Sequence, residues 1–276
     1  MKRFRYYILP APLRLFVRRL YYLPFDTYEY MLGKRPDGVP PRGKIFIGYG
    51  DYVKQGEKFL GYFKELCGLQ PNHAVLDVGC GIGRMAVPLT RFLNEKGTYD
   101  GFDIVKSGID WCNKNISPKH PNFRFQYTGL YNQLYNTSDK VDASNFVFPY
   151  DDAKFDFVLL TSSFTHLMPA EIENYINEIG RAMKPGATCL MSFFIINCVS
   201  EDLMIKKPTQ MNFPINKGLY RLQSAPVDTA NVAYDEEWLL EKLENAGLKM
   251  ESIQYGQWCG REPYFDYPDL LFCSKI

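Results

Sequence analysis

The hydrophobic residues of the chain follow two alternating patterns. Short segments of strand length occupy about residues 74–78, 98–103, 123–128, 155–160 and 188–196; some are mostly apolar, and 123–128 alternates apolar and polar residues. Between most of these segments, apolar residues recur every three or four positions, and this spacing predicts amphipathic helices. Strands that alternate with helices favour a mostly parallel sheet with helices on both faces.

The C-terminal part continues the pattern with a helix that ends at Gly247 and two further strands, at about 249–256 and 269–276. We expect these two strands to form a hairpin that closes the sheet with an antiparallel strand. Residues 198–234 fit neither a helix nor a strand pattern. A long irregular segment is typical of a functional loop, so we expect an insertion that forms a lid over the sheet edge.

Turn-forming residues 34–44 divide the chain into a basic and aromatic N-terminal extension, residues 1–44, and a main domain, residues 45–276. The extension carries apolar residues at helical spacing, with Arg14 and Arg18 off that face. The apolar positions are Leu13, Phe16, Val17, Leu20 and Tyr21. Such a helix can lie on an anionic membrane or dock on its own domain, and Leu15 blurs the pattern in favour of docking.

The stretch VLDVGCGIGRM, residues 75–85, places a glycine loop between a buried strand and a helix. Strand, glycine loop and helix form the general layout of a nucleotide-type site, with the ligand at the start of the helix. No Gly-Lys-Ser or Gly-Lys-Thr is present, as a phosphate-binding P-loop requires. A dinucleotide motif that begins at Gly79 needs its third glycine at position 84, where the chain has Arg84.

The loop also carries a carboxylate, Asp77, two residues before the first glycine. This side chain repels a pyrophosphate and suits a ligand with an ammonium group, such as S-adenosylmethionine (SAM). Asp103 ends the next strand, at the spacing of about 20 residues at which an acid accepts ribose hydroxyls. A lone glycine triplet is also typical of an ordinary tight turn, but the two acids together favour the ligand site.

Four stretches, VLDVGCGIGR, GFDIV, FDFVLLTSSFTHL and IGRAMKPGATCLMSFF, resemble the successive motifs of class I SAM-dependent methyltransferases. The resemblance implies a Rossmann-like, doubly wound, seven-stranded and mostly parallel α/β sheet. It also implies that SAM is bound and S-adenosylhomocysteine released. The implied cofactor residues are Tyr49, Gly56, Asp77, Gly79, Gly81, Asp103, Ile104, Gly129, Leu130 and Thr161. Many members have an acid near the adenine where this chain has Gly129, and Asp142 is a later candidate for that contact.

Composition narrows the partners, metal sites and locations that we expect for this chain. The formal net charge is +1, so the whole chain has no strong attraction to nucleic acid. The seven cysteines form no C-x-x-C pair and only three histidines are present, so we expect reduced thiols and no metal centre. The N-terminal apolar run is interrupted by prolines and lacks an A-x-A site, which argues against a membrane span or signal peptide. We therefore expect a cytoplasmic protein, with the extension as its only membrane-surface contact.

His166 lies in TSSFTHLM, the segment after the fourth strand, and is the only histidine expected at the strand ends. Because histidine titrates near neutral pH, it can remove the proton of a hydroxyl acceptor. The alternative is that His166 orients its loop or packs beneath the cofactor.

We therefore expect a methyltransferase that acts on a hydroxyl, or an amine, of a small-molecule, sugar or lipid-headgroup acceptor. Three alternatives stay open: a SAM-binding protein without transfer activity, an NAD-type oxidoreductase, and a membrane-surface lipid methyltransferase.

Overall fold

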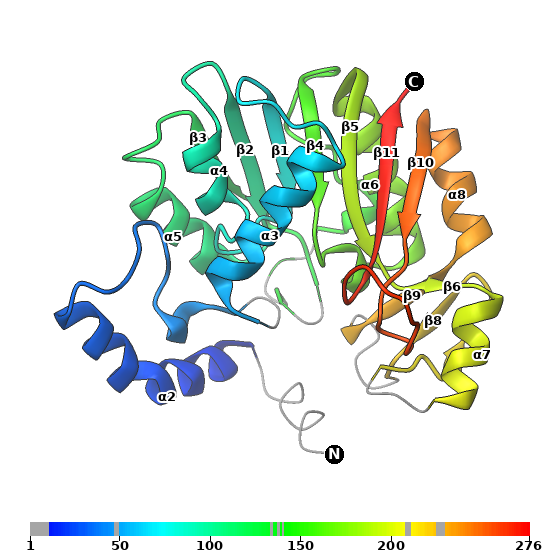
Figure 1. Cartoon of the computed structure of the whole chain (residues 1–276), viewed down its shortest axis with the longest axis horizontal. Coiled ribbons are helices and arrows are strands. Elements are labelled where there is room, and N and C mark those ends of the chain that lie inside the picture. The colour runs from blue at the N-terminus through cyan, green and yellow to red at the C-terminus, as the bar shows by residue number, and fades with distance from the viewer. Residues whose placement is uncertain are drawn as a thin grey trace.

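The computed structural model describes residues 11–46, 50–132, 135–136, 139, 141–207, 211–224 and 230–276. Its centre is a seven-stranded sheet in the order β10-β11-β5-β4-β1-β2-β3 (Figure 1). The strands are β1 (Ala74–Val78), β2 (Thr98–Asp103), β3 (Phe123–Tyr127), β4 (Phe155–Leu160), β5 (Met183–Phe193), β10 (Leu248–Gln254) and β11 (Asp269–Lys275). The pairs among β1 to β5 are parallel, and β11 is antiparallel to both of its neighbours. This arrangement confirms the predicted fold class.

Helices cover both faces of the sheet because alternate residues of each strand point to opposite sides. On β1, Val75 packs with the helices of one face and Leu76 with those of the other. The first face carries α3 (Tyr52–Glu65), α4 (Ala86–Phe92) and α5 (Lys106–Asn115), and the second carries α6 (Pro169–Ala182) and α8 (Glu236–Asn245). Burial on both faces explains the nearly continuous apolar runs of the central strands.

One boundary differs from what the local apolar pattern predicts. Apolar residues at helical spacing continue to Met183, but α6 ends at Ala182 and Met183 begins β5. Met183 pairs with Phe155 at the start of β4, so the hydrogen bonds of the neighbouring strand extend β5 towards the helix. Pairing between strands decides this boundary, and it is invisible to a local helical pattern.

The prediction that residues 198–234 contain no helix or strand is wrong. They contain the helix α7 (Cys198–Lys206), which Asn197 caps by accepting the Ser200 N–H. A second, four-stranded sheet has the order β6-β9-β8-β7. Its strands are β6 (Ile195–Ile196), β7 (Ile215–Asn216), β8 (Tyr220–Leu222) and β9 (Val232–Asp235). Strands of two to four residues are too short for a detectable alternation of apolar and polar positions.

The N-terminal extension forms the predicted helix, α2 (Ala11–Met31), which packs on a short 3₁₀ helix, η1 (Arg42–Lys44). The contact uses polar groups, since the Asp26 carboxylate accepts the N–H groups of Arg42 and Gly43 at 2.7 and 3.0 Å. The apolar positions Leu13, Phe16 and Leu20 remain exposed. The helix therefore docks on its own chain, but through the face opposite to its apolar one. In the part of the chain that the structure describes, no helix is long and apolar enough to cross a membrane.

A buried carboxylate connects the main sheet to the smaller one. Asp269, at the start of β11, is 1% exposed. Its two oxygens accept the N–H groups of Ile195 and Gly256 and the indole N–H of Trp258, each at 2.7 Å. Removing the carboxylate leaves three donors without an acceptor in the interior, which is costly because such donors have lost their water.

We expect Asp269→Ala to lower the free energy of unfolding by about 3–5 kcal/mol, since several buried donors lose their acceptor together. Urea denaturation followed by circular dichroism measures this change. The matched control is Asp110→Ala, which removes an exposed ion pair with Lys106 and costs less than about 0.5 kcal/mol. Equal losses in the two variants would contradict the role assigned to Asp269.

Candidate cofactor site

Most of the predicted site residues lie at the carboxyl ends of the parallel strands or directly after them. Asp77 lies at the end of β1 and Asp103 ends β2, and the two strands pair in register, with Val78 opposite Phe102. Asp103 in turn pairs with Tyr127 at the end of β3. Parallel strands bring their carboxyl ends to one edge, where ligands of open α/β sheets bind. In Figure 1 this edge is at the bottom of the sheet.

The glycine loop turns sharply between β1 and α4. Gly79, Gly81 and Gly83 have φ values of 81°, 60° and 81°, a conformation that side chains disfavour. Position 79 requires glycine for a second reason, because a Cβ there would lie 2.0 Å from Ser163 Oγ. The N–H groups of Gly79 and Cys80 both donate to the Phe102 carbonyl, which ties the loop to β2. The loop is therefore held in one shape by β2 on one side and by the segment after β4 on the other.

Asp77 is a buried carboxylate, 1% exposed, with only one of its oxygens partnered. Oδ2 accepts the Tyr99 hydroxyl at 2.6 Å, whereas Oδ1 has no hydrogen-bond partner among the described residues. Burial raises the pKa of Asp77 from 3.8 to about 7, against the Tyr99 hydrogen bond, which lowers it. The charge of Asp103 adds to the rise and that of Arg84 opposes it. The unpartnered Oδ1 of Asp77 is therefore available to accept a hydrogen bond from an ammonium group.

Asp103 supports the loop directly. Its Oδ2 accepts the Gly81 N–H at 2.8 Å and its Oδ1 accepts the Val105 N–H at 2.7 Å. Burial raises the pKa of Asp103 from 3.8 to about 6, and these backbone hydrogen bonds oppose the rise. Each carboxylate oxygen retains a second lone pair, so the contacts are compatible with the predicted ribose role.

Arg84 is a site residue that the sequence reasoning missed, because it served there only to exclude a dinucleotide motif. It is 9% exposed, and its Nε has no hydrogen-bond partner among the described residues. Burial lowers the pKa of Arg84, while the nearby Tyr52 and Asp77 oppose this. A buried cation beside Asp77 offers a charge complement to a carboxylate ligand. A charged residue inside an otherwise apolar and glycine-rich stretch is the signal that could have revealed it.

His166 lies in the 3₁₀ helix η3 (Phe164–His166), on the segment after β4, and is half-buried. Its Nε2 is 3.4 Å from the Tyr135 hydroxyl, and the two rings meet edge to face at 5.3 Å. Its carbonyl accepts the side-chain amide of Asn132 at 3.1 Å. The loop after β3 therefore fixes the position of this histidine at the strand-end edge.

The segment after β3 contains a second residue that the sequence reasoning missed. A Cβ on Gly129 would lie 3.1 Å from Asp139 Oδ1, so this acid lies beside the predicted adenine position. The Asp139 carboxylate accepts the Tyr127 hydroxyl and the side-chain amide of Asn136. Asp142, the acid considered from sequence, instead accepts the Ser144 N–H and caps the 3₁₀ helix η2 (Ala143–Asn145).

The other predicted residues have varied surroundings. Leu130 is buried and Ile104 is half-buried against the core. Thr161 follows β4 directly, as expected. Gly56 lies in α3, where a Cβ would be 2.7 Å from the Arg84 carbonyl, so its visible role is close helix packing. Tyr49 lies outside the described residues.

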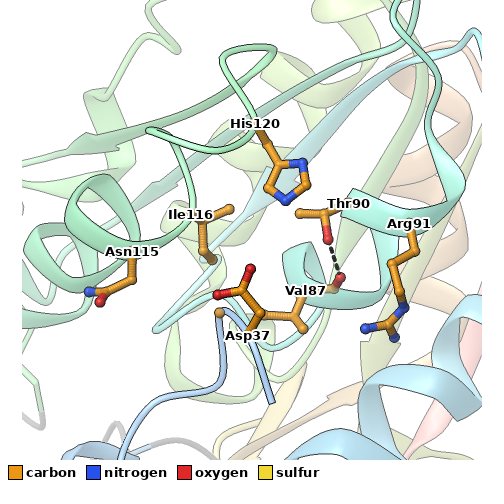
Figure 2. Close-up of a pocket in the computed structure, with 8 residues that line it drawn as sticks. Asp37, Val87, Thr90, Arg91, Asn115, Ile116 and His120 are labelled. Carbon is orange, nitrogen blue, oxygen red and sulfur yellow. Dashed lines mark hydrogen bonds between the residues drawn. The ribbon is translucent and has the colours of Figure 1, made fainter. Parts of the chain in front are cut away.

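A cavity of about 260 Å³ lies away from this edge, on the outer side of α4 and α5 (Figure 2). Asp37 and Gly38 line it from the side of the N-terminal extension, and His120 points towards it from the domain, whereas the Arg91 guanidinium pairs with Glu57. The residues that line the cavity include none of the predicted site residues. We therefore place the candidate site at the strand ends and not in this cavity.

Comparison with known proteins identifies the class of domain. The family described as "Methyltransferase domain" matches residues 75–186, which run from β1 into β5 and include the glycine loop, Asp103 and His166. Residues 75–186, less than half of the chain, therefore form a methyltransferase domain, which is consistent with the class I, SAM-dependent family that the motifs predicted. Such a domain implies SAM as the cofactor.

Individual relatives are distant. The chain is 24% identical over 178 residues to the methyltransferase GfsG of Streptomyces halstedii. The aligned region covers 64% of this chain and 54% of that protein. It is 25% identical over 128 residues to the tRNA N(3)-cytidine methyltransferase METTL2 of Danio rerio. This aligned region covers 46% of this chain and 33% of that protein. The chain thus spans between a third and about half of the length of these relatives.

Two solved structures share the fold. One is a SAM-dependent methyltransferase of Methanosarcina mazei, with a TM-score of 0.50, 20% identity and coverage of 75% of this chain and 94% of that one. The other is the PH0226 protein of Pyrococcus horikoshii, with a TM-score of 0.57, 16% identity and coverage of 84% and 95%. At these identities the likeness establishes the fold alone.

The residues around the glycine loop fit the amino-acid end of SAM. Asp77 Oδ1, Arg84 Nε and Thr128 Oγ1 are buried polar atoms without hydrogen-bond partners among the described residues. Unpartnered buried polar atoms are uncommon, and a group of them at a ligand edge indicates partners supplied from outside. Asp77 would hold the ammonium group and Arg84 the carboxylate.

We expect Gly79→Ala to lower the free energy of unfolding by about 2–4 kcal/mol, since strain at positive φ adds to the clash with Ser163. Adding Ser163→Ala to this variant removes the clashing oxygen and should restore part of the loss. The control is Gly186→Ala, at φ 77° with open space around it, where about 1 kcal/mol is expected. Urea denaturation measures all four proteins, and a loss in Gly79→Ala no greater than in the control would refute the clash.

We expect the affinity for SAM to rise with pH between about 5 and 7, because Asp77 in the ligand-free protein holds a proton below about pH 7. An ammonium ligand favours the carboxylate, so binding releases that proton, and the rise flattens above pH 7. Isothermal titration calorimetry of wild type and Asp77→Asn measures this difference.

In Asp77→Asn we expect at least about tenfold weaker binding, from the loss of a buried charge-assisted hydrogen bond, and no rise between pH 5 and 7. Measuring both proteins with the same ligand at each pH cancels the ligand's own titration. Identical pH profiles would show that Asp77 does not meet the ammonium group.

Proposed function

We propose that this chain transfers the methyl group of SAM to a hydroxyl, or an amine, of a small-molecule, sugar or lipid-headgroup acceptor. The observation that supports cofactor binding most strongly is the pair of buried and incompletely partnered charges, Asp77 and Arg84, at the glycine loop. A zwitterionic amino-acid group satisfies both charges at once, whereas a pyrophosphate would be repelled by Asp77. This contrast argues against an NAD-type oxidoreductase.

SAM supplies an electrophilic methyl group on a positively charged sulfur, so the protein has to bind, orient and exclude water. The glycine loop fixes the amino-acid end, and Asp103, anchored by two backbone N–H groups, receives the ribose. Ile82 within the loop and Leu130 after β3 are buried and would restrict water at this edge.

His166 acts in this proposal as the general base for a hydroxyl acceptor. As the oxygen bonds to the methyl carbon and the carbon–sulfur bond breaks, the hydroxyl proton passes to the imidazole. The Tyr135 hydroxyl, 3.4 Å from Nε2, positions the ring, and the bond from Asn132 to the His166 carbonyl positions its backbone. His73 and His120 belong to other parts of the chain, and His120 lines the remote cavity of Figure 2.

The acceptor class is the least constrained part of the proposal. The relatives include tRNA and sterol methyltransferases, each matched over less than half of this chain. The net charge of +1 gives no general attraction to RNA, which favours a small or lipid-linked acceptor. Transfer of tritium from labelled SAM to separate pools of small metabolites, lipids and tRNA decides between them. Cofactor binding without transfer to any pool would contradict the proposed activity.

We expect His166→Ala to lower kcat by about 10²–10⁴-fold while the affinity for S-adenosylhomocysteine changes little, because general-base catalysis contributes this much. Single-turnover kinetics and calorimetry measure the two quantities on the same preparation. His120→Ala is the matched control, since it removes a histidine away from the strand ends. Near-normal turnover in His166→Ala would show that the residue only supports its loop.

A further inference from the structure

The helix α2 exposes an apolar face to solvent. We define this outer face by Leu13, Phe16, Val17, Leu20, Tyr21 and Tyr28, whose side chains are between 45% and 67% exposed. The spacing of these residues places them on one side of the helix. A contiguous face of this kind is unusual on a soluble surface and indicates a binding partner.

The opposite face of α2 packs on η1. The contacts between the two hold the helix in this orientation, with its apolar face outward. The Asp26 carboxylate accepts two N–H groups of η1, and Glu29 pairs with Arg42 at 2.6 Å. The Arg18 side chain donates to the Arg42 carbonyl at 3.1 Å. Gly43 lies so close that a Cβ there would be 3.0 Å from the Arg19 Cα. Rolling the helix to bury its apolar face would break these contacts.

The charge of the N-terminal segment favours one kind of partner. The first 19 residues contain Lys2, Arg3, Arg5, Arg14, Arg18 and Arg19 and no acidic residue. Arg18 and Arg19 lie on the inner face of α2 and Arg14 is buried, so the positive charge belongs to the segment as a whole and not to the outer face itself. The acids of α2, Asp26 and Glu29, lie on the inner face and are already paired. A second copy of the chain would bring two such basic segments together, and their repulsion disfavours a dimer through this face. An anionic surface complements both the charge and the apolar residues.

We propose that the outer face of α2 binds an anionic lipid bilayer, with the helix lying parallel to the membrane in the headgroup region. Aromatic and aliphatic side chains on one face, together with basic residues, are what interfacial helices use for this purpose. In Figure 1, α2 lies at the end of the molecule where the parallel strands finish. Membrane contact through α2 would therefore hold the candidate site near the bilayer. The proposal concerns binding alone and does not depend on methyl transfer.

The test is sedimentation of the full chain with phosphatidylcholine vesicles, either pure or containing 30% phosphatidylglycerol as a chosen anionic fraction on the order of that in natural membranes. We expect wild type to sediment with the anionic vesicles, to bind neutral vesicles at least about tenfold more weakly, and to be released as salt rises.

The double variant Phe16→Ser, Leu20→Ser should reduce binding to anionic vesicles at least about tenfold, because two inserted side chains are lost. Both residues are more than half exposed, so the fold should persist, and thermal unfolding verifies this. The matched control is Val147→Ser, Ile205→Ser, which removes two exposed apolar residues outside α2 and should leave binding unchanged.

Three outcomes would overturn the proposal. The first is wild type that does not sediment with anionic vesicles. The second is equal loss of binding in the α2 variant and in the control. The third is a wild-type dimer that the α2 variant converts to a monomer in analytical ultracentrifugation without any vesicle binding, which would assign the face to a second copy. Binding of S-adenosylhomocysteine, measured in the same preparations, separates each outcome from a failure of the cofactor site.

Discussion

The burial of the Asp77 carboxylate at the end of the central strand is the constraint on which the site depends. A charged group in the interior is unfavourable unless it is paired, and here the Tyr99 hydroxyl satisfies only one oxygen. Asp103 nearby makes the electrostatic cost greater, and Arg84 makes it smaller. The backbone N–H groups of Gly81 and Val105 keep Asp103 in place. The edge thus carries a group of charges whose balance a zwitterionic ligand would complete in the proposed function.

The additions to the plain doubly wound sheet lie at the same edge. They are the loop after β3, the small sheet and the helix α2. The loop after β3 fixes His166 through Asn132 and Tyr135, while Asp269 ties β11 to the small sheet. The helix α2 lies at this end as well (Figure 1). The loop after β3, the start of β11 and α2 therefore lie at one end of the molecule, where the parallel strands finish.

Much of the fold could be predicted because its elements carry strong local signals. The strands β1 and β4 are mostly apolar runs, and Asp51 caps α3 by accepting the Lys54 N–H. The small sheet could not be predicted, since its strands are stabilised by pairing across residues 195–235. Asp139 was missed for a related reason, because only folding brings it beside Gly129.

The sequence by itself determined the strand, glycine loop and helix around Asp77, and with them the kind of ligand that the loop accepts. Local spacing and charge suffice for such a feature, because all of its parts lie within about a dozen residues. Only the tertiary structure decided that Arg84 is buried beside Asp77 and that α2 turns its apolar face outward. The burial of a side chain and the orientation of a helix both depend on contacts with parts of the chain that are distant in the sequence. The backbone donors of η1 require the carboxylate of Asp26, and this need overrides the usual tendency of an amphipathic helix to bury its apolar side.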